Sequence, residues 1–387
     1  MQTYKPQYLI IEPYYGGSHK VFIHGLQKSL CEQQFTLLTL PARKWKMRMQ
    51  LAAPWMAEQI VELIHKGYHF DGILTSTFID VAVLRSLLAS RGILLPVAIY
   101  FHENQFAYPS RPQDQARFQF TAINFTSALC ADSLAFNSNY NRSTFLSGIT
   151  RYLKKTADVK LGHLVDDLFD KSTVISPGMD FTRIDALEKT SEKRACPVIV
   201  WNHRWEHDKN PNRFFSALFE LSEQGADFQL LVLGETFQDC PEIFFEAKNR
   251  LEKHLLHFGY VADRSLYYEL LHKGTIVVST AIHEFFGMAV LEGVRAGCVP
   301  LVPDRLAYKE LFPTEFRYKR DQFKKRLGDL VERNEQMSQT KSQALTTPHS
   351  WDKVSAQYVH WLSALGKEKI SKTATSEMLK KKEILRI

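Results

Sequence analysis

The sequence predicts an α/β fold built from two doubly wound domains, and three observations support this prediction. Short, continuously apolar runs alternate with longer stretches of helical periodicity, which is typical of parallel strands covered by helices on both faces. The alternation starts again near residue 198, after a polar segment over residues 180–194. The length of 387 residues is enough for two hydrophobic cores.

Apolar runs mark the expected strands. They cover residues 8–12, 35–40, 71–77, 97–102, 133–138 and 172–176 in the first half, and 198–203, 228–234, 255–261, 274–280 and 299–303 in the second. Helical patterns lie between them. In the first, Phe22, Leu26 and Leu30 recur at helical spacing behind Ser18, which is a suitable N-cap.

Three regions are expected along the chain: an N-terminal domain over residues 1–190, a second domain over 191–350, and a helix with a basic, solvated tail over 351–387. Ligands of such folds bind at the carboxyl ends of the strands, so the two sheets should face a common cleft. The net charge is +7, but the tail over residues 367–387 alone holds seven cations against three glutamates. Charge therefore permits a nucleic-acid partner without singling one out.

The composition is that of an ordinary globular protein, with 45% hydrophobic and 24% charged residues. No apolar run is long enough to span a membrane, and the N-terminus lacks the apolar region and cleavage site of a signal peptide. The five cysteines are scattered and odd in number, as expected for reduced thiols. These features predict a cytoplasmic protein.

The first candidate motif is EPYYGGSHK, residues 12–20, which joins the first expected strand to the first expected helix. Gly16 and Gly17 allow a tight turn and a close approach of the backbone to a ligand. The N-terminus of the following helix offers N–H groups to an anion. A plain strand-to-helix turn has the same composition, so this motif alone leaves both interpretations open.

The second motif is WNHRWEHDKN, residues 201–210, after the first strand of the second domain. Arg204 and Lys209 combine a fork-shaped donor with a point charge on one loop, which suits a diphosphate held without a metal ion. A solvated charged loop is the alternative. His203 and His207 have the spacing of zinc ligands, but no HExxH pattern or third ligand accompanies them, so we expect no metal.

The third motif is HEFFGMAVLEGVRAGCVPLVPD, residues 283–304. Glu284 lies in the loop before an expected helix that begins near Gly287, and Glu292 lies two turns into that helix. Two carboxylates can bind hydroxyl groups of a sugar and a ribose while the helix N-terminus receives phosphates between them. An ordinary surface helix with two acids is the alternative.

Two further polar segments follow strands of the first domain. PARKWKMRM surrounds Trp45 with the cations Arg43, Lys44, Lys46 and Arg48. Such a pattern suits phosphate contacts and base stacking with RNA, although a basic surface loop with a half-buried tryptophan would look the same. His102, Glu103 and Asn104 follow the strand at 97–102. His102 is the candidate to touch a reacting sugar, with a purely structural histidine as the alternative.

The three motifs in this order resemble the family-4 retaining glycosyltransferases, whose GT-B fold consists of two Rossmann-like domains facing a cleft. The resemblance extends to about residue 315. It implies that Glu284 binds hydroxyls of the donor sugar, that Glu292 binds the nucleoside ribose, and that Arg204 and Lys209 hold the diphosphate. The segment PDRLAYKEL retains Glu310 but lacks the glycine pair that many relatives carry there.

The motifs and this resemblance together give the expected site residues. The expected catalytic residues are His102, Arg204, Lys209 and Glu284, and the remaining donor site consists of Gly16, Gly17, Phe286, Gly287, Met288 and Glu292. The expected acceptor site consists of Arg43, Lys44, Trp45, Lys46, Arg48, Glu103 and Asn104. No cofactor is implied besides the nucleotide-sugar substrate.

Longer strings are similar to a narrower group. These are IIEPYYGGSHK, PARKWKMR, YFHENQFAYP, FNSNYNRSTF, SPGMDF and WNHRWEHDKNP. The group is that of the glycosyltransferase-like domain-containing protein 1, whose members are tRNA-queuosine α-mannosyltransferases. The similarity implies GDP-mannose as the donor and, as the acceptor, the cyclopentene diol of queuosine at the wobble position of tRNA(Asp).

Two alternatives of function stay open at this point. A glycosyltransferase with the same donor machinery could use another sugar, or a lipid or polysaccharide acceptor, with the basic tail touching an anionic membrane surface. A protein of another class could bind RNA or a nucleotide sugar without catalysis. The four charged residues expected to bind the sugar donor, Arg204, Lys209, Glu284 and Glu292, are all present. Their presence argues against a catalytically silent protein.

Overall fold

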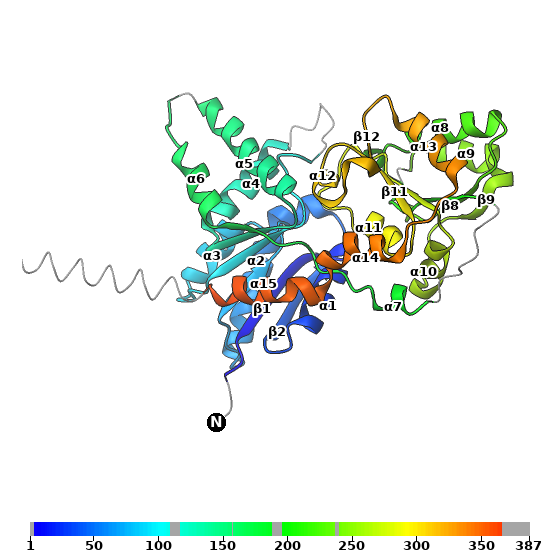
Figure 1. The fold of residues 1–387 in the computed structure, drawn as a ribbon. Coiled ribbons are helices and arrows are strands. Elements are labelled where there is room, and N and C mark those ends of the chain that lie inside the picture. The colour runs from blue at the N-terminus through cyan, green and yellow to red at the C-terminus, as the bar shows by residue number, and fades with distance from the viewer. Residues whose placement is uncertain (1–3, 109–116, 157, 188–195, 237–239, 366–387) are drawn as a thin grey trace, which may run out of the picture. The chain divides into compact units, whose positions relative to one another are not determined.

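Two parallel six-stranded sheets form the centre of the computed structural model, each with helices on both sides (Figure 1). The structure describes residues 4–108, 117–156, 158–187, 196–236 and 240–365. The chain divides into a first unit, residues 1–178 and 351–387, and a second unit, residues 179–350. The expected α/β architecture of two doubly wound domains is confirmed.

The first unit has the strand order β2-β1-β3-β4-β5-β6, with all strands parallel. The strands are β1 (Gln7–Tyr15), β2 (Gln34–Pro41), β3 (Gly72–Thr75), β4 (Val97–Phe101), β5 (Ser133–Phe136) and β6 (Ser172–Val174). The chain adds β2 on one side of β1 and then β3 on the other. This reversal creates a switch point at the carboxyl ends of β1 and β3, where doubly wound folds bind ligands.

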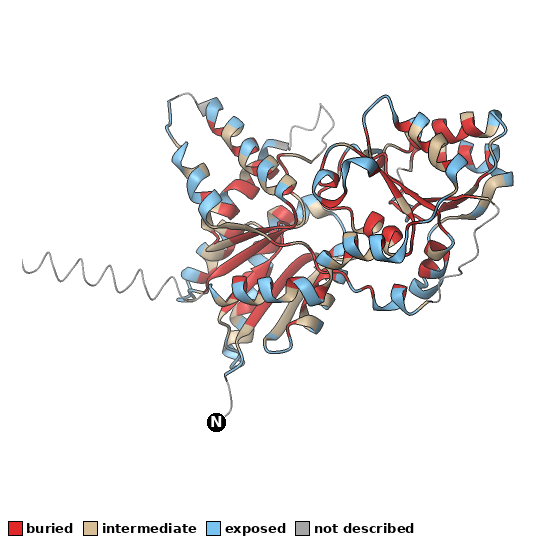
Figure 2. Ribbon diagram, in the orientation of Figure 1, coloured by how far each residue is buried: buried red, intermediate tan, exposed pale blue. Residues whose placement is uncertain are grey.

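Alternate residues of β1 enter the two cores of this unit. Leu9 and Ile11 face the core beneath α2–α6, whereas Tyr8 and Ile10 face the core beneath α1 and α15. The helices are α1 (Gly17–Ser29), α2 (Trp45–His65), α3 (Val81–Ala89), α4 (Arg117–Cys130), α5 (Asn139–Leu153), η1 (Lys154–Thr156), α6 (His163–Asp170) and α15 (Trp351–Ser363). Both faces of the sheet are therefore buried (Figure 2).

Helix α15 brings the end of the described chain back to the first unit. The indole of Trp351 packs so closely on Gly25 and Gly178 that a Cβ atom on either would lie 2.1 Å from it. The Tyr358 hydroxyl donates to the Ser176 carbonyl at 2.9 Å, and the Trp361 indole donates to Ser133 Oγ at 2.7 Å. The expected helix after residue 351 is present, and it belongs to this unit. The expected basic tail lies outside the described residues.

The second unit has the strand order β12-β11-β10-β7-β8-β9, again all parallel. The strands are β7 (Val198–Trp201), β8 (Gln229–Val232), β9 (Leu255–Phe258), β10 (Ile276–Val278), β11 (Val299–Pro303) and β12 (Arg317–Tyr318). Here the order reverses between β7 and β10. This is the arrangement of dinucleotide-binding sheets, and it places the second switch point after those two strands.

Helices cover both faces of the second sheet, with α8, α9 and α13 burying Ile199 and Trp201 on one side. The helices are α7 (Thr182–Asp185), η2 (His207–Lys209), α8 (Pro211–Glu223), α9 (Ile243–Arg250), η3 (Glu252–His254), α10 (Arg264–His272), α11 (Met288–Arg295), α12 (Tyr308–Leu311), η4 (Thr314–Phe316), α13 (Phe323–Arg333), α14 (Gln339–Thr346) and η5 (Thr347–His349). Helix α11 packs against β10 and β11 and carries α14 on its outer side.

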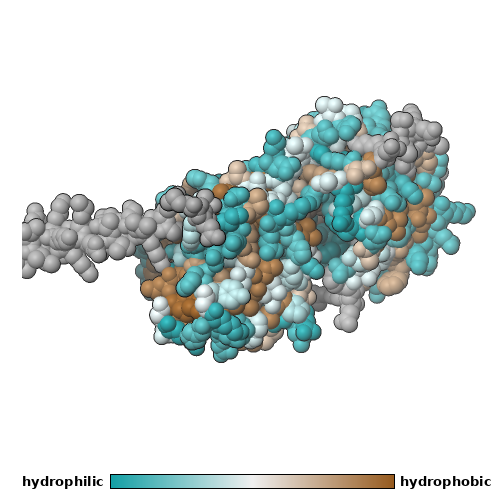
Figure 3. Space-filling view, turned by 90° about the horizontal axis from the view of Figure 1, so that it is seen from below, coloured by the Kyte–Doolittle hydropathy of each residue, from teal (hydrophilic) through white to brown (hydrophobic). Residues whose placement is uncertain are grey.

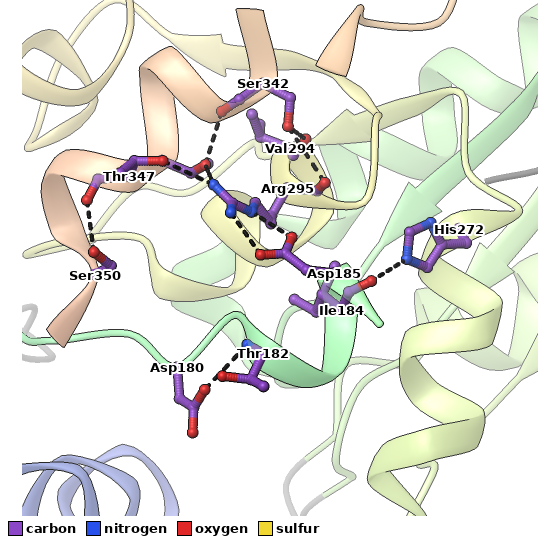
Figure 4. Close-up of polar contacts among 11 residues, drawn as sticks. Asp180, Thr182, Ile184, Asp185, His272, Val294, Arg295, Ser342, Thr347 and Ser350 are labelled. Carbon is purple, nitrogen blue, oxygen red and sulfur yellow. Dashed lines mark hydrogen bonds and ion pairs between the residues drawn. The ribbon is translucent and has the colours of Figure 1, made fainter. Parts of the chain in front are cut away.

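Arg295 ties the two ends of the second unit together (Figure 4). Its guanidinium donates to both carboxylate oxygens of Asp185, at 2.7 and 2.6 Å, and to the hydroxyls of Thr346 and Thr347, at 3.1 and 2.9 Å. The Met179 amide donates to the His349 carbonyl at 2.9 Å. The unit therefore begins at Met179. The expected boundary at residue 190 differs because the start of the expected linker forms α7, which packs within this unit.

Hydrophilic residues cover much of the molecular face in Figure 3, with smaller apolar patches between them. Among the residues that the structure describes, no helix is long and apolar enough to cross a membrane. All five cysteines are free thiols.

Candidate functional site

In the second unit, the loops after β7 and β10 are joined by hydrogen bonds at the switch point. The Thr280 hydroxyl donates to the carbonyls of Lys209 and Asn210, both at 2.9 Å. The Ile282 amide donates to the Asp208 carbonyl at 2.7 Å. Two of the predicted motifs, which are more than 70 residues apart in sequence, thus form one structural element.

Lys209 and Glu284 form a largely buried ion pair in this element. Lys209 Nζ lies 3.3 Å from Glu284 Oε2, 3.1 Å from Asp208 Oδ2 and 3.0 Å from the His283 carbonyl. Burial lowers the pKa of Lys209, but Glu284 and Asp208 more than reverse this and raise it above its ordinary value. Burial raises the pKa of Glu284, whereas Lys209 and His203 lower it to about 2. Both groups are therefore charged near neutral pH.

Arg204 and His203 lie beside this pair but differ in exposure. The Arg204 side chain is 50% exposed and lies 3.0 Å from Glu206 Oε2, so it can turn toward an anion in solvent. His203 is buried, and burial together with Lys209 lowers its pKa to about 4, which leaves the ring neutral. The described residues contain no group of three or more His, Cys, Asp or Glu placed to hold a metal ion.

The N-terminus of α11 completes the element. Gly287 has φ of +106°, a conformation that favours glycine, and a Cβ atom there would lie 2.8 Å from the Tyr308 ring. The amide of the buried Phe286 donates to Glu284 Oε1 at 3.3 Å, and the partly buried Met288 opens the helix. The first turn of a helix offers N–H groups and a positive dipole end to an anion, here next to Glu284.

Glu292 lies on α11 and is held by residues of α10. Its Oε1 accepts from Arg264 at 2.8 Å and its Oε2 accepts from the Tyr267 hydroxyl at 2.9 Å. The amide of Asn202, which follows β7, donates to the Tyr267 oxygen at 3.1 Å and to the Ala289 carbonyl at 2.6 Å. This network orients Glu292 and connects it to the loop that carries Arg204.

In the first unit, a buried histidine lies between two carboxylates at the carboxyl ends of the strands. His19 Nδ1 lies 2.9 Å from Glu12 Oε2, and its Nε2 lies 3.4 Å from Glu103 Oε2. Burial lowers the pKa of His19, but Glu12 and then Glu103 more than reverse this and raise it to about 10. His19 is therefore an imidazolium at neutral pH. Glu12 also accepts from the Tyr14 amide at 2.8 Å and the Ser76 hydroxyl at 2.9 Å.

The ring of His102 lies against this cation at a tilted angle. The ring centroids of His19 and His102 are 4.1 Å apart, and burial together with the His19 charge holds the pKa of His102 well below its ordinary value. His102 is therefore neutral. The carboxylate of its neighbour Glu103 is 15% exposed and accepts from the Thr77 hydroxyl at 2.7 Å. The two neighbours thus present a neutral ring and an anchored carboxylate at one edge.

The glycine pair opens α1 close to these residues. Gly17 has φ of +49°, in the region that glycine favours. Gly16 is extended, but a Cβ atom on it would lie 2.5 Å from the Cβ of Ala42. Both positions therefore disfavour a side chain. Gly17 does so through its backbone angle, and Gly16 does so because the loop after β2 lies close to it.

Two of the predicted acceptor residues, Asn104 and Trp45, pack against other side chains of the first unit. Asn104 is fully buried, with its amide nitrogen bonded to Asn141 Oδ1 at 2.8 Å and its oxygen bonded to the Ala107 amide at 3.0 Å. We therefore assign it to the support of its loop. The Trp45 ring packs among Phe78, Tyr108 and Phe120. Of the predicted cations nearby, Arg43, Lys44 and Lys46 are exposed and Arg48 is half-buried.

The structure adds polar residues that we did not single out from the sequence. Glu12 and His19 lie within EPYYGGSHK, which we interpreted only through its glycines, although an acid and a histidine beside a ligand-binding turn were a usable signal. Arg264 and Tyr267 hold Glu292 from another helix, and no local pattern marks them. The structure brings Arg204, Lys209, Glu284 and Glu292 into one region of the second unit.

Comparisons with known proteins agree with this geometry. Residues 7–179 match the family "tRNA-queuosine alpha-mannosyltransferase N-terminal", and residues 183–345 match "Glycosyl transferases group 1". The tRNA-queuosine alpha-mannosyltransferase of Drosophila melanogaster is 36% identical over 327 residues, which cover 82% of this chain and 85% of the relative.

Solved structures of similar fold have much lower sequence identity. Anabaena HepE in complex with UDP has a TM-score of 0.66 at 14% identity, over 93% of this chain and 100% of the other. Sucrose-phosphate synthase from Thermosynechococcus elongatus has a TM-score of 0.67 at 13% identity, over 93% of this chain and 99% of the other.

The protein is a glycosyltransferase of GT-B fold. Its two parallel sheets, the joined loops at the switch point of the second sheet and these similarities all lead to this class. Identity over most of both chains narrows the class further. The chain belongs to the tRNA-queuosine alpha-mannosyltransferase family.

Proposed function

We propose that this chain transfers mannose from GDP-mannose to the cyclopentene diol of queuosine at the wobble position of tRNA(Asp). The observation that carries the proposal is the 36% identity to the Drosophila enzyme across both units. The family match over residues 7–179 is specific to the queuosine enzymes, whereas the match over 183–345 is shared with glycosyl transferases in general. We therefore assign acceptor choice to the first unit and donor binding to the second.

The second unit supplies what a nucleotide-sugar donor requires. Arg204, which is half-exposed, binds the diphosphate together with Lys209 and the amides of the first turn of α11. Glu284, fixed by Lys209 and the Phe286 amide, accepts hydrogen bonds from hydroxyls of the sugar. Glu292, held by Arg264 and Tyr267, accepts from the ribose.

The reaction retains the configuration at the anomeric carbon. The bond from that carbon to the diphosphate oxygen breaks as the acceptor hydroxyl oxygen bonds to the same face, and the hydroxyl proton passes to the departing diphosphate oxygen. Two cations and a helix dipole offset the negative charge that develops on the leaving group, so the proposed step needs no metal ion.

The first unit holds the acceptor nucleoside. His102 is neutral because of its burial and its contact with the His19 cation. A neutral imidazole can donate one hydrogen bond to the mannosyl group or accept one from it. Glu103 is anchored by Thr77 and can accept from the diol. The exposed cations at the start of α2 contact RNA phosphates. A tRNA acceptor and five free thiols support a cytoplasmic location.

A donor panel tests this assignment. Purified protein and queuosine-containing tRNA are incubated with GDP-mannose, GDP-glucose, UDP-galactose or UDP-glucose, each with and without EDTA. We expect transfer from GDP-mannose alone, unchanged by EDTA, and a product that is cleaved by an α-mannosidase and not by a β-mannosidase. Transfer from a UDP-sugar, loss of activity with EDTA, or a β-linked product would each overturn the corresponding part of the proposal.

A further inference from the structure

Two basic segments of the first unit, distant in sequence, flank the first turn of α4. Lys46, at the start of α2, has its Nζ 5.9 Å from the centroid of the Phe120 ring. Lys155, in η1 after α5, has its Nζ 4.6 Å from the centroid of the Phe118 ring. Phe118 and Phe120 are two residues apart on α4 and project to different sides of the helix, so the two segments lie on either side of the same helical turn.

The chain segments that carry these cations have no acidic residue of their own. Residues 33–57, 117–131 and 133–157 contain no Asp or Glu. The exposed cations at the start of α2 are Arg43, Lys44 and Lys46, and those at the end of α5 and in η1 are Arg151, Lys154 and Lys155. Arg151 lies in the last turn of α5, and Lys154 and Lys155 lie in the short helix η1 that follows it. We call these six cations, together with Phe118, the cationic surface.

Phe118 gives the surface an aromatic ring that solvent can reach. Phe118 is 57% exposed although it is a large apolar residue. The ammonium of Lys155 over its ring keeps a cation and a flat apolar face together. This pairing suits RNA, which offers phosphates at regular spacing and bases that can stack on aromatic rings.

The cationic surface is connected to the edge where we place the acceptor nucleoside. Trp45, between Lys44 and Lys46, contacts Phe78 with ring centroids 6.1 Å apart, and Phe78 contacts His19 at 5.3 Å. A chain of ring contacts therefore leads from the surface to the Glu12–His19–Glu103 group. One RNA molecule can place a nucleoside at that edge and neighbouring phosphates on the cations.

We propose that the cationic surface binds the sugar–phosphate backbone of the tRNA at nucleotides other than the one that receives the sugar. This inference rests on the proposed function, because it takes a tRNA as the acceptor. Phosphate contacts carry little sequence information, so the surface contributes affinity and orientation, while the nucleoside at the strand edge determines the specificity.

The test is the variant Lys154→Glu/Lys155→Glu, assayed with full-length queuosine-containing tRNA at several KCl concentrations. We expect the dissociation constant for tRNA to rise at least about tenfold at low salt, since each lost phosphate contact removes close to one unit from the salt slope. The slope of log K against log [KCl] should become shallower by about 1 to 2. The affinity for GDP-mannose without tRNA should stay that of the parent protein.

The matched control is Lys248→Glu/Lys253→Glu, which reverses two exposed cations of the second unit. Equal tRNA affinity and salt slope in parent, variant and control would overturn the inference. So would a parent that binds anionic phosphatidylserine vesicles through Lys154 and Lys155 but gains no tRNA affinity from them. Failure of the proposed function has a different signature: no mannose would enter tRNA even where tRNA binds through these lysines.

Discussion

Each unit of the molecule buries a cation between carboxylates at the switch point of its sheet, but the two cations differ in chemistry. In the second unit the cation is Lys209, which carries its charge even in water. In the first unit it is His19, which is charged at neutral pH only because Glu12 and Glu103 flank it. The comparison shows that the proposed donor site has a permanent charge, whereas the charge of the acceptor side depends on two neighbours and on pH.

The largest expected effect is on the stability of the second unit. Lys209→Met leaves Glu284 and Asp208 without their buried partner, which should lower the free energy of unfolding by about 3–5 kcal/mol. Urea unfolding followed by tryptophan fluorescence, to which the buried Trp201 and Trp205 of this unit contribute, measures the change. Lys209→Met/Glu284→Gln should lose less than the two single variants added together. Additive losses, or an equal loss for the exposed control Lys273→Met, would contradict the ion pair.

Arg204 tests the same site through activity. Its side chain is half-exposed, so Arg204→Ala should unfold at the same temperature as the parent protein. Turnover should fall by about 10²–10³, because one charge-stabilising donor to the leaving group is lost. The control is Arg333→Ala, an exposed arginine on α13 that should leave turnover unchanged. Near-normal turnover of Arg204→Ala would remove Arg204 from the donor site.

The third prediction concerns pH. The folded-state pKa of His19 is about 10, above the unfolded value of about 6.5, so the folded protein holds an extra proton between these values. The stabilisation by His19 is therefore complete below pH 6.5 and is lost as pH rises toward 10. Glu12→Gln should be less stable at pH 7 and should show a flatter decline with pH. Urea midpoints between pH 6 and 10 that fall equally in both proteins would argue against the cationic histidine.

His203 of the second unit provides the opposite case within the same molecule. Its folded-state pKa of about 4 lies below the unfolded value, so protonation favours the unfolded state as pH falls from about 6.5 toward 4. His203→Gln should flatten the acid side of the stability profile and leave the alkaline side unchanged. The protein would then lose stability above about pH 6.5 through His19 and below about pH 6.5 through His203. Urea midpoints of the two single variants across this pH range would separate the two contributions.

The smallest expected effects come from the glycines that open α1 and α11. Gly287→Ala should cost about 1–3 kcal/mol, because it combines a left-handed backbone with a close approach to Tyr308. Gly16→Ala should cost about 1 kcal/mol, because only the Ala42 side chain obstructs it. Ala42→Gly should therefore restore the stability of Gly16→Ala. Absence of this rescue in thermal unfolding would contradict the close packing of the two loops.

Local patterns were sufficient to predict most of the fold. Every strand expected from an apolar run is present, because parallel strands buried on both faces are continuously apolar. Strand β12 was missed because it has two residues and no pattern of its own. The return of α15 to the first unit was also missed. It depends on Trp351 fitting against Gly25 and Gly178, a contact between distant residues that no periodicity records.

The sequence predicted those parts of the candidate site whose residues are close together in the chain and also in the structure. Glu284, Gly287 and Glu292 lie on one loop and helix, so their order in the sequence was informative. The charge state of His19 was only partly predictable: Glu12 is close in sequence, but Glu103, which also raises the pKa of His19, is 84 residues away. Asn104 was expected at the acceptor, yet it is fully buried, since a side-chain type does not reveal which way it points. Trp45 is partly buried among aromatic rings, and its expected contact with the acceptor stays a prediction.

The most direct test of the proposed function is the incorporation of radiolabelled mannose from GDP-mannose into tRNA from two sources. One sample comes from cells that contain queuosine and the other from cells that lack it, with the purified protein as the only enzyme. We predict label in the tRNA(Asp) of the first sample and none in the second. Equal labelling of both samples, or of neither while the protein still binds GDP-mannose, would contradict queuosine as the acceptor.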